Sequence, residues 1–209
     1  MINWTFEAAL KTSADIVQVA TDSEKIFNLF PSANTVMTSS NHLSGTDRVY
    51  EAVSKIGLND DDVIVNVQGD EPFISPKDIN NIFNLISKEE ISMATLYSDS
   101  TSVSDLEDSN KVKILVNNGI ASNFFRETSL KDNIYIHQGV YAFKYGTLKN
   151  FVSWEPSDNE KKYKLEQFRA IDNGIEINAI KSVSKIHLGV DTEEDLKKAN
   201  EIAKEDSYK

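Results

Sequence analysis

A run of β-branched residues that leads straight into polar and acidic residues constrains the fold of this chain more than any other feature. Residues 63–67 are Val-Ile-Val-Asn-Val, and Gln68-Gly69-Asp70-Glu71-Pro72 follow directly. The run is typical of a buried strand. Ligands of open α/β sheets bind beyond the carboxyl ends of such strands. The acidic residues therefore either form a solvated turn after a core strand or belong to a cation site, and spacing alone favours neither.

Helical and extended patterns alternate through the first half of the chain. Helical spacing predicts helices over 2–13, about 22–30, 46–56 and 75–87, whereas strands are expected over 16–20, 35–38, 63–67 and 93–97. This alternation is typical of a parallel, doubly wound α/β sheet. The glycine-rich phosphate turn that usually follows the first strand of such a sheet is missing before residue 45.

The second half contains a hairpin signal. Asn117-Asn118-Gly119 separates two apolar runs at 112–116 and 120–125, which predicts a tight β-turn. Further strands are expected over 136–144 and 177–183, a helix over 157–173, and a closing helix after Asp191. We therefore expect one domain over 1–209, an α/β fold with a doubly wound mixed sheet, and a subsidiary β element over 111–144.

Composition excludes several classes of function. The 209 residues carry 33 acidic and 22 basic side chains, a net charge of −11, which argues against nucleic acid and anionic membrane surfaces as partners. The lack of cysteine excludes disulfides, zinc-thiolate sites and thiol nucleophiles. Neither a signal peptide pattern nor an apolar run of about 18 residues occurs, so we expect a cytoplasmic protein without a membrane span.

Two further segments combine a helix cap with possible chemistry. Ser44-Gly45-Thr46-Asp47-Arg48 reads as a capped helix start, or as backbone N–H groups and an arginine that bind an anion or a base edge. Gly189-Val190-Asp191-Thr192 ends a strand and opens a helix. Asp191 therefore either interacts with the positive end of the helix dipole or supplies a second carboxylate ligand for a metal ion.

Two polar positions have similarly open interpretations. His137, at the start of a predicted strand, could hydrogen-bond to a polar substrate or simply to the backbone. Glu166 and Arg169 lie three residues apart on the predicted 157–173 helix, where a surface ion pair is the simplest account.

Taken together, these segments resemble the CMP-Kdo synthetases, the 3-deoxy-manno-octulosonate cytidylyltransferases. The matching strings span essentially the whole chain and keep their order and spacing. They are VATD (19–22), MTSSNHLSGTDR (37–48), VNVQGDEP (65–72), MATL (93–96), HQGVYAFK (137–144), FVSWEPS (151–157), LEQFRAI (165–171) and GVDTEEDL (189–196).

The resemblance implies a nucleotide-diphospho-sugar-transferase-like fold, a homodimer, and the Mg²⁺-dependent reaction CTP + Kdo → CMP-Kdo + diphosphate, on the route to lipopolysaccharide. It implies catalytic roles for Asp70, Asp191 and Arg48, the two aspartates being the metal ligands. The positions that it places around the substrates are Gln68, His137, Glu166 and Gln167 near the sugar acid, and Ser44 and Thr46 with Arg48 near the nucleotide and the sugar.

The sequence departs from the family in two places. The family begins with a strand and a loop whose Arg, Ser and Lys side chains hold the CTP phosphates, and Met1-Ile2 match the residues just after that loop. Because this strand lies inside the sheet, we expect two unpaired strand edges and hypothesise that residues 1–209 are a fragment or a late-start product. The second departure, over 126–131, affects a loop near the site or the dimer contact.

Two alternatives stay open. The first is a cytidylyltransferase for another acidic sugar, such as sialic acid or an amino-Kdo. The second is a non-catalytic remnant that binds a sugar or dimerises, which the missing phosphate loop favours and the retained Asp70, Asp191, Gln68, Glu166 and Gln167 argue against.

Overall fold

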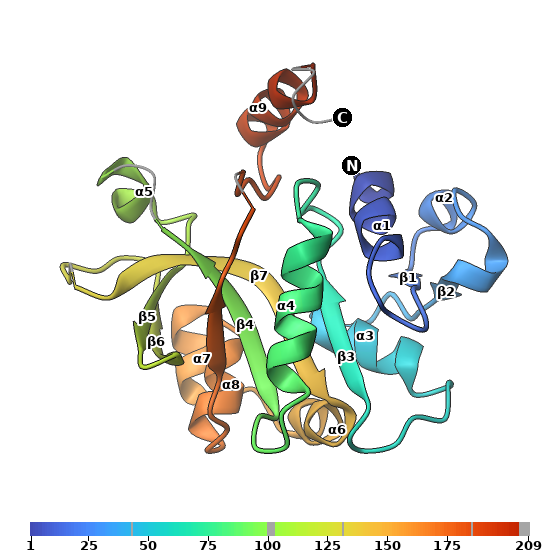
Figure 1. The fold of residues 1–209 in the computed structure, drawn as a ribbon, viewed down its shortest axis with the longest axis horizontal. Coiled ribbons are helices and arrows are strands. Elements are labelled where there is room, and N and C mark those ends of the chain that lie inside the picture. The colour runs from blue at the N-terminus through green and yellow to red at the C-terminus, as the bar shows by residue number, and fades with distance from the viewer. Residues whose placement is uncertain (43, 100–102, 131, 185, 205–209) are drawn as a thin grey trace.

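A computed structural model describes residues 1–42, 44–99, 103–130, 132–184 and 186–204 (Figure 1). The helices are α1 (Ile2–Leu10), α2 (Glu24–Phe27), α3 (Gly45–Val53), α4 (Pro76–Ile86), α5 (Val103–Glu107), α6 (Tyr145–Ser153), α7 (Asp158–Tyr163), α8 (Gln167–Asp172) and α9 (Glu193–Lys204), with a 3₁₀ turn at Ser32–Asn34. The strands are β1 (Val19–Thr21), β2 (Thr35–Met37), β3 (Val63–Val67), β4 (Met93–Ser98), β5 (Lys113–Asn117), β6 (Ile120–Phe125), β7 (Ile134–Lys144) and β8 (Asn178–Lys181).

A six-stranded mixed sheet forms the centre of the molecule, in the order β3-β7-β4-β8-β6-β5. β7 runs antiparallel to both β3 and β4 and lies between them, and its first residues also pair with β5. β4 and β8 are parallel neighbours. The predicted mixed sheet is confirmed. The alternating pattern also predicts parallel pairing for β3 and β4, but these strands do not pair, because β7, from the second half of the chain, lies between them.

Both faces of the sheet are covered by helices, which explains its nearly continuous apolar strands. α4 lies across one face (Figure 1), where Ile82 and Ile86 pack with Ala142 of β7. On the other face, Phe143 of the same strand packs with Phe151 of α6. Successive residues of β7 thus point into two different clusters, as the two-residue period of a strand requires.

Local signals place several element ends. The Ser75 side chain accepts a hydrogen bond from the backbone N–H of Lys77, and Pro76 takes the first position of α4, within one residue of the predicted start of the 75–87 helix. The hairpin is also confirmed, since Asn118 and Gly119 both have positive φ angles of 52° and 81°. The single helix expected over 157–173 is wrong: Lys164, with φ of 54°, ends α7, and α8 begins at Gln167. α6 was not predicted.

A buried lysine joins the hairpin to its surroundings. Lys113 is fully buried, and its Nζ donates hydrogen bonds to the carbonyl oxygens of Asp108 at 2.7 Å, Lys111 at 3.0 Å and Arg126 at 2.5 Å. The segment 126–131, where the sequence departs from the family, is therefore anchored at its first residue. Its last residue, Lys131, and Leu43 in the 37–48 string lie outside the described residues.

The remaining two strands form a separate sheet. β1 and β2 pair in parallel with each other, and no strand within the described ranges pairs with β1 on its other side or with the outer edge of β3. A cavity of about 1080 Å³ lies between them, lined by apolar residues that include Val19, Ala52, Val65 and Phe6. The two unpaired edges agree with what the resemblance led us to expect. Figure 1 shows β1 and β2 beside α1, apart from β3.

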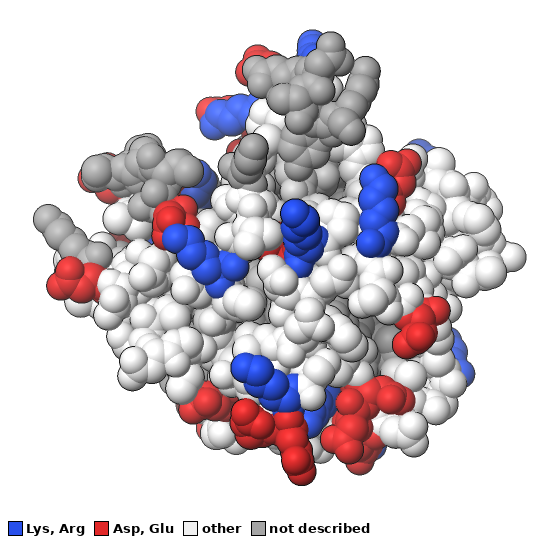
Figure 2. Space-filling model, viewed as in Figure 1, with Lys and Arg blue, Asp and Glu red and all other residues white. Residues whose placement is uncertain are grey.

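The last helix and the surface charges complete the description. α9 stands away from the sheet (Figure 1), and Ala199 is its buried residue. Figure 2 shows acidic side chains gathered along the edge of the molecule opposite α9. Within the described part of the chain, no helix has the length and apolar character that a membrane crossing requires.

Candidate functional site

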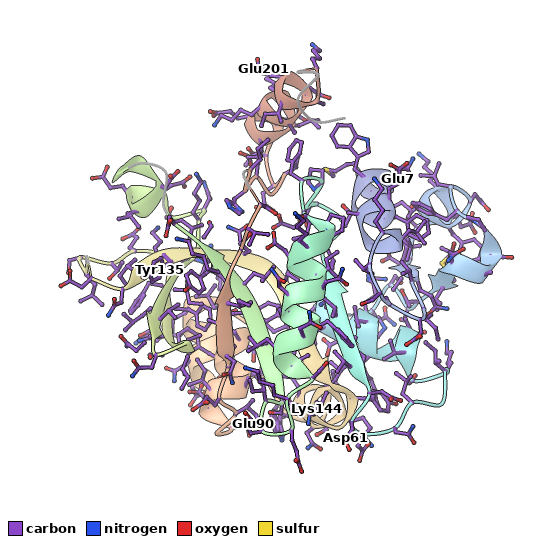
Figure 3. The ribbon with its side chains drawn as sticks, in the orientation of Figure 1. Glu7, Asp61, Glu90, Tyr135, Lys144 and Glu201 are labelled. Carbon is purple, nitrogen blue, oxygen red and sulfur yellow. The ribbon has the colours of Figure 1, made fainter. Side chains whose placement is uncertain are left out.

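Asp70 and Asp191, 121 positions apart in the sequence, meet beyond the carboxyl end of β3. The backbone N–H of Val190 donates a 3.0 Å hydrogen bond to the carbonyl oxygen of Asp70, which brings the two segments together. The pKa of Asp70 is raised, first by burial and then by repulsion from Asp191. Figure 3 labels Asp61 and Lys144, which form a 3.7 Å ion pair near the opposite end of β3.

Glu71 is a third carboxyl group at this place, which the sequence predictions did not single out. Burial and the charges of Asp70 and Asp191 raise its pKa to about 7, and a hydrogen bond from the backbone of Gly139 acts in the opposite direction. The signal for it was present in the sequence, since Glu71 directly follows Asp70 in the polar turn after the buried strand.

The paired aspartates suit one kind of metal site. The described residues contain no group of three or more His, Cys, Asp or Glu side chains arranged to hold a metal ion. A closed protein cage for zinc or calcium is therefore not formed by them. Mg²⁺, in contrast, is commonly held by one or two carboxylates together with substrate phosphates and water. Two aspartates that repel each other fit that ion.

A second group of predicted residues gathers where α3 meets α8. The Ser44 hydroxyl caps α3 by accepting from the backbone N–H of Asp47 at 3.1 Å. Thr46 donates from Oγ1 to Oε2 of Glu166 at 3.0 Å. Glu166 Oε1 and Gln167 Nε2 are buried and have no hydrogen-bond partner among the described residues. A buried acceptor and a buried donor are thus left without partners, and such atoms are costly unless a ligand pairs with them.

The simple account of Glu166 as half of an ion pair with Arg169 is wrong. The Arg169 guanidinium binds Glu160 instead, from Nε at 2.8 Å and from Nη2 at 2.6 Å, and lies over the ring of Phe151. Burial raises the pKa of Glu166, although hydrogen bonds from Ser44 and Thr46 oppose the shift. The bidentate pair with Glu160 leaves Glu166 available to the site.

His137 lies inside the sheet and is neutral. Its Nε2 is 2.9 Å from Oγ1 of Thr95, and that hydroxyl donates to the carbonyl oxygen of Val140. Because the hydroxyl has one proton to give, Nε2 must carry the imidazole proton. Burial lowers the pKa of His137 to about 3. Tyr141 lies beside the ring, and the charge of Glu166 helps to raise the tyrosine pKa, which links His137 to the second group.

Arg48 and Gln68 lie on other sides of the site. Arg48 donates to Thr38 Oγ1 at 2.7 Å and to Asp22 Oδ2 at 3.1 Å, so it is tied to β1 and β2 and borders the cavity. The exposed Gln68 side chain lies close to Gly139 on β7, near Glu71. The predicted residues therefore form a carboxylate group at the end of β3, a polar group around Glu166, and an arginine at the cavity.

Solved structures define the class. The chain matches a CMP:2-keto-3-deoxy-manno-octonic acid synthetase complexed with CTP, with a TM-score of 0.86 and 29% identity over 97% of this chain and 86% of that one. A Francisella tularensis 2-C-methyl-D-erythritol 4-phosphate cytidylyltransferase has the same fold at 18% identity, with a TM-score of 0.67 over 95% of this chain and 86% of that one. The fold is that of the nucleotide-diphospho-sugar transferases, and the class is that of the nucleotidyltransferases.

Sequence relatives narrow the class further. The cytidylyltransferase family model matches residues 1–177. A curated relative from Pseudomonas fluorescens, named 3-deoxy-manno-octulosonate cytidylyltransferase, is 37% identical over 97% of this chain and 87% of its own length. The chain belongs to the cytidylyltransferase family.

Proposed function

We propose that the chain transfers CMP from CTP to Kdo, giving CMP-Kdo and diphosphate for lipopolysaccharide synthesis. The observation that carries the proposal is the meeting of Asp70 and Asp191 in a chain that also holds the buried, unpartnered polar atoms of Glu166 and Gln167. This arrangement occurs in a chain 37% identical to a named 3-deoxy-manno-octulosonate cytidylyltransferase.

The residues have separable tasks in this reaction. Asp70 and Asp191 would hold Mg²⁺, which supplies charge neutralisation for the phosphates and the attacking sugar hydroxyl when it is bound. Gln167 Nε2 offers a donor and Glu166 Oε1 an acceptor to the sugar acid. Thr46 fixes Glu166 by a hydrogen bond, and Ser44 caps the helix that carries Thr46. Catalysis of this kind depends mainly on positioning and electrostatics, so no protein nucleophile is required.

The remaining predicted residues border the same reaction. Gln68 lies close to Gly139 of β7, and His137 precedes Gly139 by two residues on the same strand, so we assign both to the sugar acid. Arg48, tied to Asp22 and Thr38, is assigned to the nucleotide side. We also propose a cytoplasmic homodimer, as the family resemblance implies, and light scattering on the purified chain tests the dimer.

A substrate panel tests the function. The purified chain is incubated with Mg²⁺, with each nucleoside triphosphate in turn, and with Kdo, sialic acid or an amino-Kdo, and diphosphate release is measured. Turnover with CTP and Kdo supports the proposal. If the chain prefers another acidic sugar, that sugar replaces Kdo as the proposed substrate. Asp70→Asn and Asp191→Asn variants should each lose most of the activity. If no combination turns over while a sugar acid still binds, the non-catalytic alternative holds.

A further inference from the structure

We infer that Glu71 is a positioning residue, whose carboxyl group keeps the segment bearing Asp191 opposite Asp70. The inference rests on the proposed function, because it gives Glu71 a task in the same metal site. It adds a residue to which neither the sequence motifs nor the comparisons assign a role. Three segments meet at its side chain: the turn after β3, the middle of β7 and the chain that leads into α9.

The contacts of the Glu71 side chain join these segments. Its Oε1 packs against Gly139 on β7, where a Cβ atom would lie 3.6 Å from it. The same Oε1 fits against Gly189 so closely that a Cβ atom at that position would lie 3.3 Å from Oε1 and 3.8 Å from the Glu71 carboxyl carbon. The backbone of Gly189, two residues before Asp191, therefore packs directly on this carboxyl group.

The main chain of Glu71 is held as well. Its carbonyl oxygen accepts from the Thr5 hydroxyl of α1 at 3.2 Å and from the backbone N–H of Ile74 at 3.4 Å. Its own N–H donates to the carbonyl oxygen of Gln68 at 3.2 Å. Since both the backbone and the carboxyl end are fixed, the side chain can set the place of the segment that it touches.

The geometry favours positioning over metal ligation. The described residues include no three-ligand group, and Asp191 is exposed while the Glu71 side chain is enclosed by Gly139 and Gly189. Asp70 and Asp191 repel each other, so the segments that carry them would move apart without other contacts. The hydrogen bond from Val190 to Asp70 and the packing of the Glu71 carboxyl group against Gly189 supply those contacts. Groups that orient metal ligands in this way commonly change metal affinity when they are removed.

The test compares Glu71→Ala with Glu71→Gln. Glutamine keeps the shape of the side chain that packs against Gly139 and Gly189, whereas alanine removes that packing. Binding of Mn²⁺ alone, followed by electron paramagnetic resonance, should weaken about tenfold or more in Glu71→Ala and less than about threefold in Glu71→Gln. The Mg²⁺ concentration for half-maximal transfer should rise in parallel. Asp78→Asn is the control, because Asp78 is a fully buried carboxylate whose hydrogen bonds go to residues 182–184.

A second variant keeps the inference testable if Glu71→Ala folds poorly. Gly189→Ala places a methyl group against Oε1, so it should weaken Mn²⁺ binding in the parent chain but have little further effect in the Glu71→Ala background. Unchanged Mn²⁺ affinity in Glu71→Ala, equal loss in the alanine and glutamine variants, additive losses in the double variant, or a parent chain that binds no Mn²⁺ would each overturn the inference. Absence of cytidylyl transfer with Mn²⁺ binding intact refutes the proposed function alone.

Discussion

The hydroxyl of Thr46 donates a 3.0 Å hydrogen bond to Glu166, a residue 120 positions further along the chain. This bond holds the N-terminal turn of α3 to the start of α8. It also uses one carboxylate oxygen of Glu166, so that the second, Oε1, is the one left for a ligand. The contact therefore decides how Glu166 is presented to the sugar.

Replacing Thr46 by valine should impair both folding and substrate binding. Valine keeps the volume but leaves Glu166 Oε2 without its donor, and an unsatisfied buried acceptor costs about 1–3 kcal/mol. We expect kcat/KM for the sugar to fall about tenfold, the equivalent of about 1.4 kcal/mol. Thr46→Ser, which keeps the hydroxyl, is the control and should stay within about threefold of the parent, because the Glu166 bond is retained. Equal activity of the valine variant would show that the bond is not needed.

His137 should stay neutral across the physiological range. Its folded pKa of about 3 lies below the ordinary value of 6.5, so the unfolded chain takes up the proton first as pH falls. Its contribution to stability is complete above pH 6.5 and is lost progressively as pH falls towards 3. Nuclear magnetic resonance of ¹⁵N-labelled histidine should show an Nε2–H tautomer that does not change between pH 5 and 8. Titration of His137 in that range would contradict this expectation.

Lys113 should contribute strongly to stability although it is a charged residue. Lys113→Met retains most of the apolar volume but removes the donor from three carbonyl groups, each of which costs about 1–3 kcal/mol when it is buried and unpaired. A clear fall in melting temperature is expected. Lys111→Met is the matched control: Lys111 is more exposed and pairs with Asp105, and surface pairs of this kind contribute about 0–1 kcal/mol. Similar melting temperatures for the two variants would contradict the account.

The cavity between β1 and β3 should tolerate larger side chains. Ala52 on α3 is buried yet lines the cavity, so Ala52→Leu adds apolar groups where space exists. At about 0.8 kcal/mol for each buried methylene, the melting temperature should rise and binding of a hydrophobic dye should fall. Ala121→Leu is the control, because Ala121 is buried in the closed core of the hairpin and overpacking there costs about 1–3 kcal/mol. If Ala52→Leu destabilises the chain as Ala121→Leu does, the cavity does not accept the larger side chain.

Short-range signals predicted much of the fold. Val63–Val67 is a strand with the predicted bounds, and the serine-proline start of α4 and the Asn118-Gly119 turn lie where the sequence placed them. In each case the residues involved are neighbours in sequence. The break at Lys164 and the position of β7 between β3 and β4 were not predictable in the same way. Both depend on packing against distant segments, which local propensity does not contain.

The candidate site shows the same division. Asp70 could be placed beyond a strand end from the sequence alone, but its proximity to Asp191 followed from the family resemblance and is now seen in the fold. Glu71 was quoted but not chosen, because its importance depends on the backbone of Gly139 and Gly189. The pairing of Arg169 with Glu160 rather than Glu166 depends on the break between α7 and α8, which periodicity did not reveal.

The length and central place of β7 have a consequence for hydrogen exchange. One strand carries His137, Gly139 and Tyr141, and the same strand pairs with β3, β4 and β5. Each of its amide protons is freed when β7 separates from the neighbour on that side, so exchange along the whole strand requires separation on both sides, an opening that approaches complete unfolding. Exchange at these amides should therefore follow global stability, and damage to the binding surface along β7 should coincide with loss of the fold.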